Sequence, residues 1–239
     1  MLTLALDASA GEATVAVMND DRVLAAAETP LVDRRRDPLL PVVIGVLAEA
    51  GYGVRDLRRV VCGDGPGGFT ALRLAAATAK GIAWGAVSGT GRGEGQGRDL
   101  ELWACPSLVL VPTGAQPPVD AGEYLVLLDA QRGECYAGHV TVAANGRVTR
   151  YDGYRRVPRE AALKYAMTEH LTPIGPSETL LCRPHARGVA QLTSERAGDN
   201  LVRRVDIAVW EPDYGRLAEA QVRWEQVHQR PLPTDGGSR

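Results

Sequence analysis

The sequence predicts an α/β fold in which one order of elements, β-β-β-α-β-α, occurs twice along 239 residues. Three observations predict it. Three short apolar strands open the chain, two unusually apolar helices follow with a strand between them, and the second half repeats this order. The repeat concerns the order of elements and not sequence identity.

The first half opens as a three-stranded meander, because short apolar runs alternate with polar turns. The helix that follows spans about 38–50, with Asp37 suited to the N-cap, Pro38 to the first helical position and Gly51 to the residue after its end. Apolar side chains surround this helix almost completely, which predicts burial on more than one side. The three expected strands are residues 2–8, 13–18 and 23–28.

A strand at 59–62 leads into the glycine-rich turn Gly63–Gly68. A second helix is expected over about 70–85, again with few charged side chains and with many alanines that would let another helix approach closely. Residues 85–98 are rich in glycine and predict a loop or linker.

The second half carries the same kinds of signal. A short helix or a pair of strands is expected around 100–112, and Asn145-Gly146 is a strong hairpin signal. Pro158 opens a helix with the sequence PREAALKYAM, and the last helix is expected at about 214–228. The other expected elements are strands at about 124–129, 134–142, 147–156, 178–182 and 205–209, and a helix at 186–196.

Each half matches the half-unit of the ribonuclease-H-like fold, and actin-like and sugar-kinase-like (ASKHA) proteins contain this unit twice. We expect an N-terminal lobe at 1–112, which carries the two apolar helices, and a C-terminal lobe at 113–213. The helix at 214–228 is expected to pack back on the first lobe, and residues 229–239 to form a disordered tail.

The composition limits the classes of function. The net charge of −2 gives no overall electrostatic attraction to nucleic acid. The four cysteines form no CxxC pair and the four histidines no HxxxH pair, so the sequence offers no local metal site and predicts reduced thiols. The first residues predict a strand and not a signal peptide, and no apolar run is long enough to span a membrane, so we expect a cytoplasmic protein.

Two segments of the first half could carry chemistry. The turn Gly63–Gly68 precedes a helix N-terminus, where backbone N–H groups can hold an anion, although it lacks the Gly-Lys-Ser/Thr of a Walker A loop. A tight turn that needs glycines for positive φ is the alternative. Asp7 and Ser9 end the first strand, where actin-like ATPases place an aspartate and a hydroxyl residue against metal and phosphate. A turn stabilised by these two side chains is the alternative.

Asp129 occupies the matching strand end of the second half. With Asp7 across a cleft it could bind a metal, and a hairpin with a salt-bridged tip is the alternative. The second half has no Gly-Gly turn of the kind that forms the adenosine pocket of these ATPases, and no nucleophile triad has a local signature. We therefore predict no catalytic residue, no metal site and no cofactor of the chain's own.

Four segments, in order over nearly the whole chain, resemble the TsaB (YeaZ) family. The segment CGDGPGGFTALRLAAATAKGIAWG is similar to the glycine-rich turn and small-residue helix of that family. The other three segments are LALDASAGEATVAVMNDDRVLA, LLDAQRGECYAG and EPDYGRLAEA. Gly68 replaces the usual Ser and Ala71 the usual Gly, which weakens any ligand role of the turn.

The resemblance implies a non-catalytic scaffold or activator subunit of the complex that forms N6-threonylcarbamoyladenosine at position 37 of tRNA. It implies pairing with a TsaD-type catalytic subunit and a TsaE-type ATPase, contact with tRNA only through the complex, ATP only through the TsaE-type partner, and a homodimer when the chain is alone. The interface would lie on the two apolar helices, at Leu39, Leu40, Val43, Val46, Leu47, Leu72, Ala75, Ala76, Ala79 and Ile82. A vestigial nucleotide-binding role stays open for Asp7, Ser9, Gly65, Gly67 and Gly68.

Two alternative functions stay open. An ATPase, a kinase-like or a glycoprotease-like enzyme of the same fold would use Asp7, Ser9, Asp129 and the glycine turn, and requires ATP binding by the isolated chain. A homodimeric binding module unrelated to tRNA would use the same apolar helices, and would not pair with a TsaD-type protein.

Overall fold

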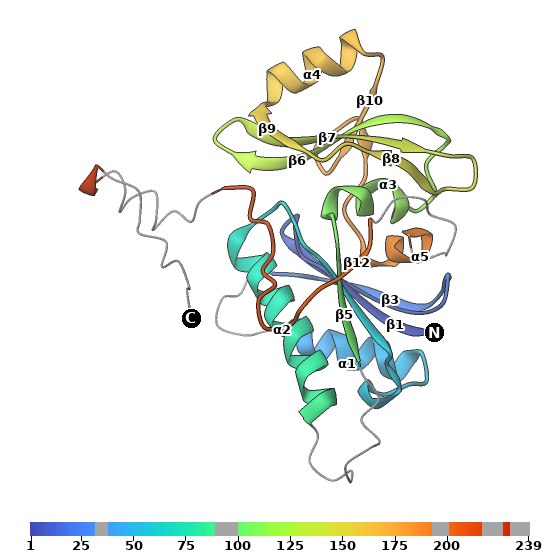
Figure 1. Ribbon diagram of the computed structural model, residues 1–239. Helices are drawn as coiled ribbons and strands as arrows, with labels where there is room; N and C mark the ends of the chain where they lie inside the picture. The colour runs from blue at the N-terminus through green and yellow to red at the C-terminus, as the bar shows by residue number, and fades with distance from the viewer. Residues whose placement is uncertain (32–37, 89–99, 193–200, 217–226, 230–239) are drawn as a thin grey trace.

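The structure is a computed structural model that describes residues 1–31, 38–88, 100–192, 201–216 and 227–229. Two β-sheets lie one above the other, with helices on their outer faces and between them (Figure 1). The first sheet, sheet A, is built from the first half of the chain plus the late strand β12, and the second sheet, sheet B, from the second half.

Sheet A has the strand order β12-β5-β4-β1-β2-β3. The first three strands form an antiparallel meander, and β4 and β5 extend it in parallel on the other side of β1. Nearly every side chain of β1 and β2 is buried, because both faces of the sheet are covered. The strands are β1 (Leu2–Asp7), β2 (Glu12–Asn19), β3 (Arg22–Pro30), β4 (Arg59–Gly63), β5 (Glu101–Cys105) and β12 (Arg203–Arg204).

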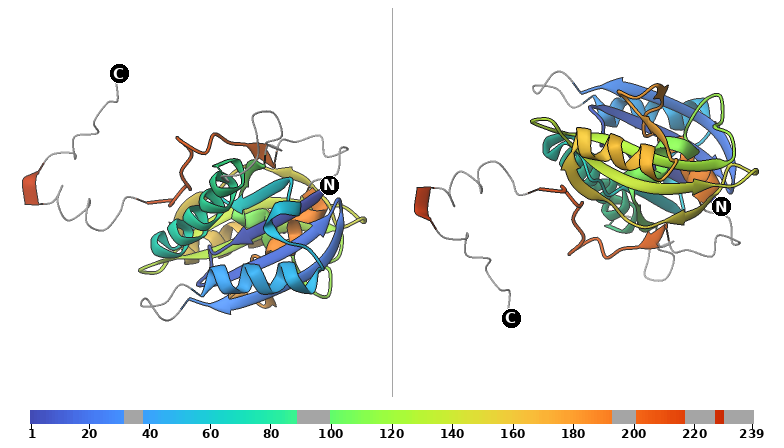
Figure 2. Two further views of the ribbon diagram at one scale, coloured as in Figure 1. Left: turned by 90° about the horizontal axis from the view of Figure 1, so that it is seen from below. Right: turned by 90° about the horizontal axis from the view of Figure 1, so that it is seen from above.

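Two helices, α1 (Leu39–Glu49) and α2 (Phe69–Ser88), cover the outer face of sheet A, and a short 3-10 helix, η1 (Val54–Asp56), precedes β4. Val43 of α1 and Ala79 of α2 are fully buried against this face of the sheet. The view from below shows both helices on the face of sheet A that points away from sheet B (Figure 2).

Sheet B has the strand order β11-β10-β6-β7-β8, and β9 also pairs with β7. One described helix, α4 (Arg159–Thr168), covers its outer face through a small apolar cluster (Figure 2). The strands are β6 (Gly122–Gln131), β7 (Glu134–Val142), β8 (Val148–Tyr151), β9 (Arg155–Pro158), β10 (Thr172–Gly175) and β11 (Leu180–Leu181).

Short helical turns fill the space between the two sheets, and their side chains join both inner faces into one apolar core. They also tie the halves of the chain together by hydrogen bonds, since the Ala186 N–H donates to Thr14 Oγ1 at 3.0 Å. These turns are η2 (Ser107–Val109), α3 (Leu110–Thr113), η3 (Ala186–Gly188) and α5 (Val189–Leu192).

The topology confirms the predicted fold class. In both sheets an antiparallel meander is extended by parallel strands on the far side of its first strand, β1 in sheet A and β6 in sheet B. This is the ribonuclease-H-like arrangement, present twice. The lobe boundaries at residues 112 and 213 remain predictions. None of the helices in the described ranges combines the length and apolarity needed to cross a membrane.

Four elements of the second half differ from the sequence-based expectation. The strand expected at 147–156 is two strands, because the chain leaves the edge of β7 at 152–154, where Gly153 has φ +81°. The segment expected to form one strand at 178–182 contains only the two-residue strand β11. The strand β10 was not predicted, because it is four residues long and contains a proline. The helix expected at 186–196 is the turn η3 followed by α5, up to the last described residue there.

The fourth difference is the short strand expected at 205–209. The strand is β12 at Arg203–Arg204, which pairs antiparallel with β5 in sheet A. Two consecutive arginines carry no strand pattern of their own, and the open edge of β5 supplies the partner. Most of the helix expected at 214–228, the tail beyond 229 and the glycine-rich segment beyond 88 lie outside the described residues, and residues 214–216 are not helical.

Candidate functional site

Asp7 is the centre of a buried polar network at the carboxyl end of β1. Its side chain is 1% exposed. Oδ1 accepts hydrogen bonds from the Ser9 N–H at 3.0 Å and the Ser9 hydroxyl at 2.8 Å, and Oδ2 accepts one from the Ser107 hydroxyl at 2.5 Å. Ser107 Oγ accepts in turn from the Gly65 N–H at 3.0 Å. Three segments far apart in the sequence therefore meet at one carboxylate.

The glycine turn after β4 packs directly against this network. A Cβ at Gly63 would overlap the Asp7 carboxylate, and a Cβ at Gly67 would overlap the backbone of Ser9. The Gly68 N–H donates to the Ser9 carbonyl at 3.3 Å. Close approach to a side chain at Gly63 and to backbone at Gly67 is thus the physical reason for glycine at both positions.

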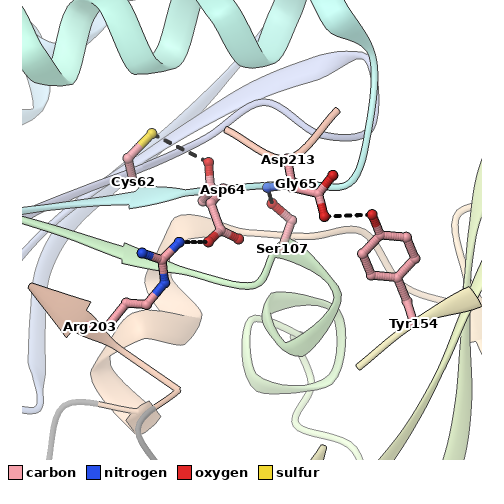
Figure 3. Close-up of polar contacts among 8 residues, drawn as sticks. Cys62, Asp64, Gly65, Ser107, Tyr154, Arg203 and Asp213 are labelled. Carbon is pink, nitrogen blue, oxygen red and sulfur yellow. Dashed lines mark hydrogen bonds and ion pairs between the residues drawn. The ribbon is translucent and has the colours of Figure 1, made fainter. Parts of the chain in front are cut away.

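A segment near the C-terminal end of the chain, Arg203–Arg216, covers the outside of the same turn, and we call it the strap. The Asp213 N–H donates to the Asp64 carbonyl at 2.6 Å, and Arg203 forms an ion pair with the Asp64 carboxylate at 2.9 Å. Tyr154 of the second half donates to Asp213 Oδ2 at 2.6 Å (Figure 3). The strap therefore joins the glycine turn to both lobes.

Aromatic contacts extend this bridge. The Tyr214 ring of the strap lies 4.4 Å from the Phe69 ring at the start of α2, measured between centroids. Tyr136 of β7 donates to the Tyr214 carbonyl at 3.2 Å. Further along the strap, Trp210 is 6% exposed and packs in the apolar core under α2.

Burial controls the ionisation of this site. Desolvation raises the pKa of Asp7, and the hydrogen bonds from Ser107 and Ser9 act in the opposite direction. Burial also raises the pKa of Asp64, opposed by Arg203. The thiols of Cys62 and Cys105 have pKa values well above their usual range, because burial and the carboxylates Asp7 and Asp64 both disfavour the thiolate. Neither thiol is suited to act as a nucleophile.

The geometry brings together all five residues for which a nucleotide role stayed open: Asp7, Ser9, Gly65, Gly67 and Gly68. Both carboxylate oxygens of Asp7 and the N–H groups of Gly65 and Gly68 bond to the protein's own atoms. A phosphate at this turn would have to displace Ser107 and the strap residue Asp213. The arrangement is therefore an internal cross-link between three segments.

Sequence reasoning missed four members of this cross-link: Ser107, Arg203, Asp213 and Tyr154. Ser107 alone gave a signal, since it is a small polar residue next to a wholly apolar run and directly after a strand. Asp129 lies exposed at the end of β6 and accepts a hydrogen bond from the Gln131 N–H at 2.8 Å. Among the described residues no group of three or more His, Cys, Asp or Glu side chains could hold a metal ion.

The apolar helices present to solvent a different set of side chains from the one predicted. Among the ten predicted interface residues only Leu40 is exposed, at 44%. The other nine pack inside the chain and are at most 8% exposed, because α1 and α2 dock on sheet A through their most regularly spaced apolar positions. These nine are Leu39, Val43, Val46, Leu47, Leu72, Ala75, Ala76, Ala79 and Ile82.

A second apolar surface remains on the outside of the two helices, and we call it the outer helical face. It consists of Leu40 and Ile44 on α1 and of Ala77, Gly81 and Trp84 on α2. Ile44 is 57% exposed and Trp84 is 60% exposed. Nothing within 4 Å would meet a Cβ at Gly81, so the backbone of α2 is open to close approach there. Both helices are thus apolar on more than one side, as predicted, but within the described chain only the side toward sheet A is buried.

The comparisons with known proteins concern both the sequence and the fold. The family model described as "TsaD: tRNA N6-adenosine threonylcarbamoyltransferase" matches residues 33–87, which include α1, β4, the glycine turn and most of α2. The tRNA threonylcarbamoyladenosine biosynthesis protein TsaB of Escherichia coli is 30% identical over 61% of this chain and 58% of its own length. The protein of the same name from Bacillus subtilis is 27% identical over 58% of this chain and 54% of its own length.

The matched stretches thus span little more than half of these relatives. Among solved structures, YeaZ from Pseudomonas aeruginosa superimposes with a TM-score of 0.64 at 23% identity, over 89% of this chain and 99% of that one. This likeness establishes the fold over almost the whole chain. Together, the sequence relatives and the fold confirm the resemblance predicted from the four sequence segments.

Proposed function

We propose that this chain, which its sequence and fold group with the TsaB (YeaZ) family, is a non-catalytic subunit of the complex that forms N6-threonylcarbamoyladenosine at position 37 of tRNA. In this proposal it pairs with a TsaD-type catalytic subunit through the outer helical face and is bound by a TsaE-type ATPase. It carries no cofactor of its own, works in the cytoplasm, and forms a homodimer through the same face when it is alone.

The observation that carries the proposal is the outer helical face. Ile44 and Trp84 expose more than half of their side chains on two neighbouring helices. Exposed large apolar side chains gathered on adjacent elements mark interaction surfaces. Ala77 and Gly81 on α2 are small and exposed, so a helix of a partner could approach the α2 backbone closely. The face also lies within the stretch that matches the TsaD family model.

The Asp7 network supports the non-catalytic part of the proposal. Both carboxylate oxygens of Asp7, the Ser9 hydroxyl and the N–H groups of Gly65 and Gly68 are here bonded within the same chain. The network holds the glycine turn in place, and the strap residue Asp213 joins that turn to Tyr154 of the second half, which favours a fixed relation between the two halves. A scaffold needs that fixed relation, whereas an ATPase of this fold would need a site open to nucleotide.

The net charge supports an indirect contact with tRNA. A chain with a net charge of −2 gains little from counterion release on RNA. A basic partner would have to supply the phosphate contacts, so the chain alone is expected to bind tRNA weakly.

The experiment is light scattering on a size-exclusion column, with the chain alone and mixed with the TsaD-type protein of the same organism. We expect a one-to-one complex in place of the homodimer. An interface of ordinary size buries about 800 Å² on each partner. Ile44→Asp and Trp84→Glu should weaken the association by about a hundredfold, because each places an unpaired charge in a desolvated contact.

Two controls make the result specific. Met167→Glu changes a side chain that is 80% exposed on α4, far from the outer helical face, and should leave the association unchanged. Val43→Asp changes a core side chain, and should unfold the chain instead of separating the partners. If Ile44→Asp and Trp84→Glu are folded and still assemble like the unchanged chain, the outer helical face is not the interface.

The alternative is a nucleotide-binding ATPase, a kinase-like or a glycoprotease-like enzyme of the same fold. It is favoured by one observation, the meeting of Asp7, Ser9 and the glycine turn at one place. Calorimetric titration of the isolated chain with Mg-ATP distinguishes the enzyme from the non-catalytic scaffold subunit. Binding that Asp7→Asn abolishes without unfolding the chain would favour the enzyme, and no heat of binding is expected for the scaffold.

A further inference from the structure

A cavity of about 430 Å³ lies on the outer face of sheet B, beside α4, and we call it the sheet B groove. Its apolar lining includes Leu125 and Ala137 from the sheet and Ala162 from the helix. The volume falls within the range of about 300–1,000 Å³ that is usual for small-molecule sites. It is remote from the outer helical face, because α4 and the pair α1 and α2 lie at opposite ends of the molecule (Figure 1).

The groove exists because one short helix covers an outer face that is only partly apolar. Sheet A has two helices on its outer face, and α4 is the one described helix on that of sheet B. The register places His139 opposite Leu125 and Arg155 opposite Ala137, so all four side chains share the outer face. The break between β8 and β9 at 152–154 leaves the strand segment around His139 without a neighbour on that side.

The polar side chains of the groove leave one positive charge unmatched. Arg150 and Asp152 form a closed ion pair, with Nε to Oδ1 at 3.1 Å and Nη2 to Oδ2 at 2.6 Å. Arg155 lines the same groove and forms no ion pair or hydrogen bond with any described residue. Arg155 is therefore the charged side chain of the groove lining that lacks a partner of opposite charge among the described residues.

A second polar atom in the groove also lacks a partner. His139 Nε2 is shielded from solvent and makes no hydrogen bond with the described residues, and Glu123 Oε1 lies 3.9 Å away, beyond hydrogen-bond distance. Buried polar atoms without partners are uncommon in native structures. His139 lines the cavity with its ring, but its shielded Nε2 is closed to a ligand atom in this conformation.

We propose that the sheet B groove binds a small monocarboxylate with an apolar body. The carboxylate would pair with the Arg155 guanidinium, and the apolar body would cover the accessible side chains of Ala137, Val157 and Tyr165. Guanidinium and carboxylate match in geometry and form charge-assisted hydrogen bonds. A phosphate dianion fits less well, because one free positive charge cannot balance two negative charges beside Asp152 and Glu123.

The test is a titration of the ¹⁵N-labelled chain with 4-phenylbutanoate, followed by amide chemical shifts in two-dimensional NMR. We expect saturable shifts at Ala137, Gly153 and Ala162. Arg155→Gln should raise the dissociation constant about tenfold or more, since it removes a charge-assisted bond. Arg156→Gln is the matched control, because this neighbouring arginine points to the other face of β9 and pairs with Glu134 at 3.3 Å.

Two further measurements distinguish binding at this site from non-specific binding. The neutral 4-phenylbutanamide should bind at least about tenfold more weakly than the carboxylate. Ala161→Phe fills the groove from an exposed position on α4, and should abolish the shifts while the rest of the spectrum is retained. The proposal is overturned if no saturable shift occurs, if the amide binds equally well, or if both arginine variants weaken binding alike.

Discussion

Replacing Ser107 with alanine is expected to destabilise the fold by about 3 kcal/mol at pH 7. The change removes two hydrogen bonds at once. The Asp7 carboxylate loses its donor at 2.5 Å, and the Gly65 N–H loses its acceptor at 3.0 Å. A hydrogen bond to a charged group contributes about 1.5–3 kcal/mol, and an unsatisfied buried N–H costs about 1–3 kcal/mol. Because both bonds belong to one network, their losses overlap, and the total is expected to be less than the sum of the two.

The assay is thermal and urea-induced unfolding of both chains. For a chain of this size the loss corresponds to a fall in Tm of about 6–12 °C. The urea midpoint should fall without a change in the slope, because the compactness of the two states is unaffected. Ser177→Ala is the control, since Ser177 is an exposed serine that contributes only its carbonyl oxygen to a hydrogen bond.

The loss should depend on pH in a defined direction. The pKa of Asp7 is raised above its ordinary 3.8 in the folded chain, so burial of its charge weakens the fold above that raised pKa. Ser107 favours the charged form, and Ser107→Ala raises the pKa of Asp7 further. The destabilisation is therefore full at pH 7 and shrinks as the pH falls and Asp7 takes up a proton. A loss below about 0.5 kcal/mol at pH 7, or one that is equal at all pH values, would refute the reasoning.

Three further predictions concern other parts of the structure. Gly67→Ala should destabilise the chain by about 1–3 kcal/mol in urea unfolding, because its Cβ overlaps the backbone of the first turn, whereas Gly81→Ala should stabilise it by up to about 1 kcal/mol through helix propensity. A thiol reagent at pH 8 should label Cys182 first, because it is the one partly exposed cysteine, and the other three should react only after unfolding. Tyr154→Phe should remove the bond to Asp213 and speed amide hydrogen exchange in the strap, and unchanged exchange would contradict the role given to that bond.

Local sequence signals were sufficient for the elements that form from neighbours in the chain. The helices α1 and α2 and the hairpin β6–β7 lie within a few residues of their expected ranges, because apolar spacing, capping residues and turn residues are local properties. The short strands β10, β11 and β12 were displaced or missed. Their positions depend on the edge of a neighbouring strand, which no local pattern records.

The same distinction applies to the interface prediction. Excess apolarity correctly indicated that α1 and α2 would be apolar on more than one side. It could not tell which side would face sheet A, and the residues chosen were mostly those that the sheet covers, such as Val43 and Ala79. The exposed side chains Ile44 and Trp84 differ from them only in the direction in which they point.

The sequence alone therefore determined the doubled order of elements, the two apolar helices and the glycine turn, since each follows from the spacing of residues along the chain. Only the tertiary structure decided that Asp7, Ser107 and the strap residue Asp213 converge on that turn, and that the turn is bonded to the chain itself. Asp7 and Ser107 are 100 residues apart in sequence, and Asp213 lies about as far again beyond Ser107. Their meeting depends on how two sheets and the segment between them pack, which is a property of the whole fold and of no single segment.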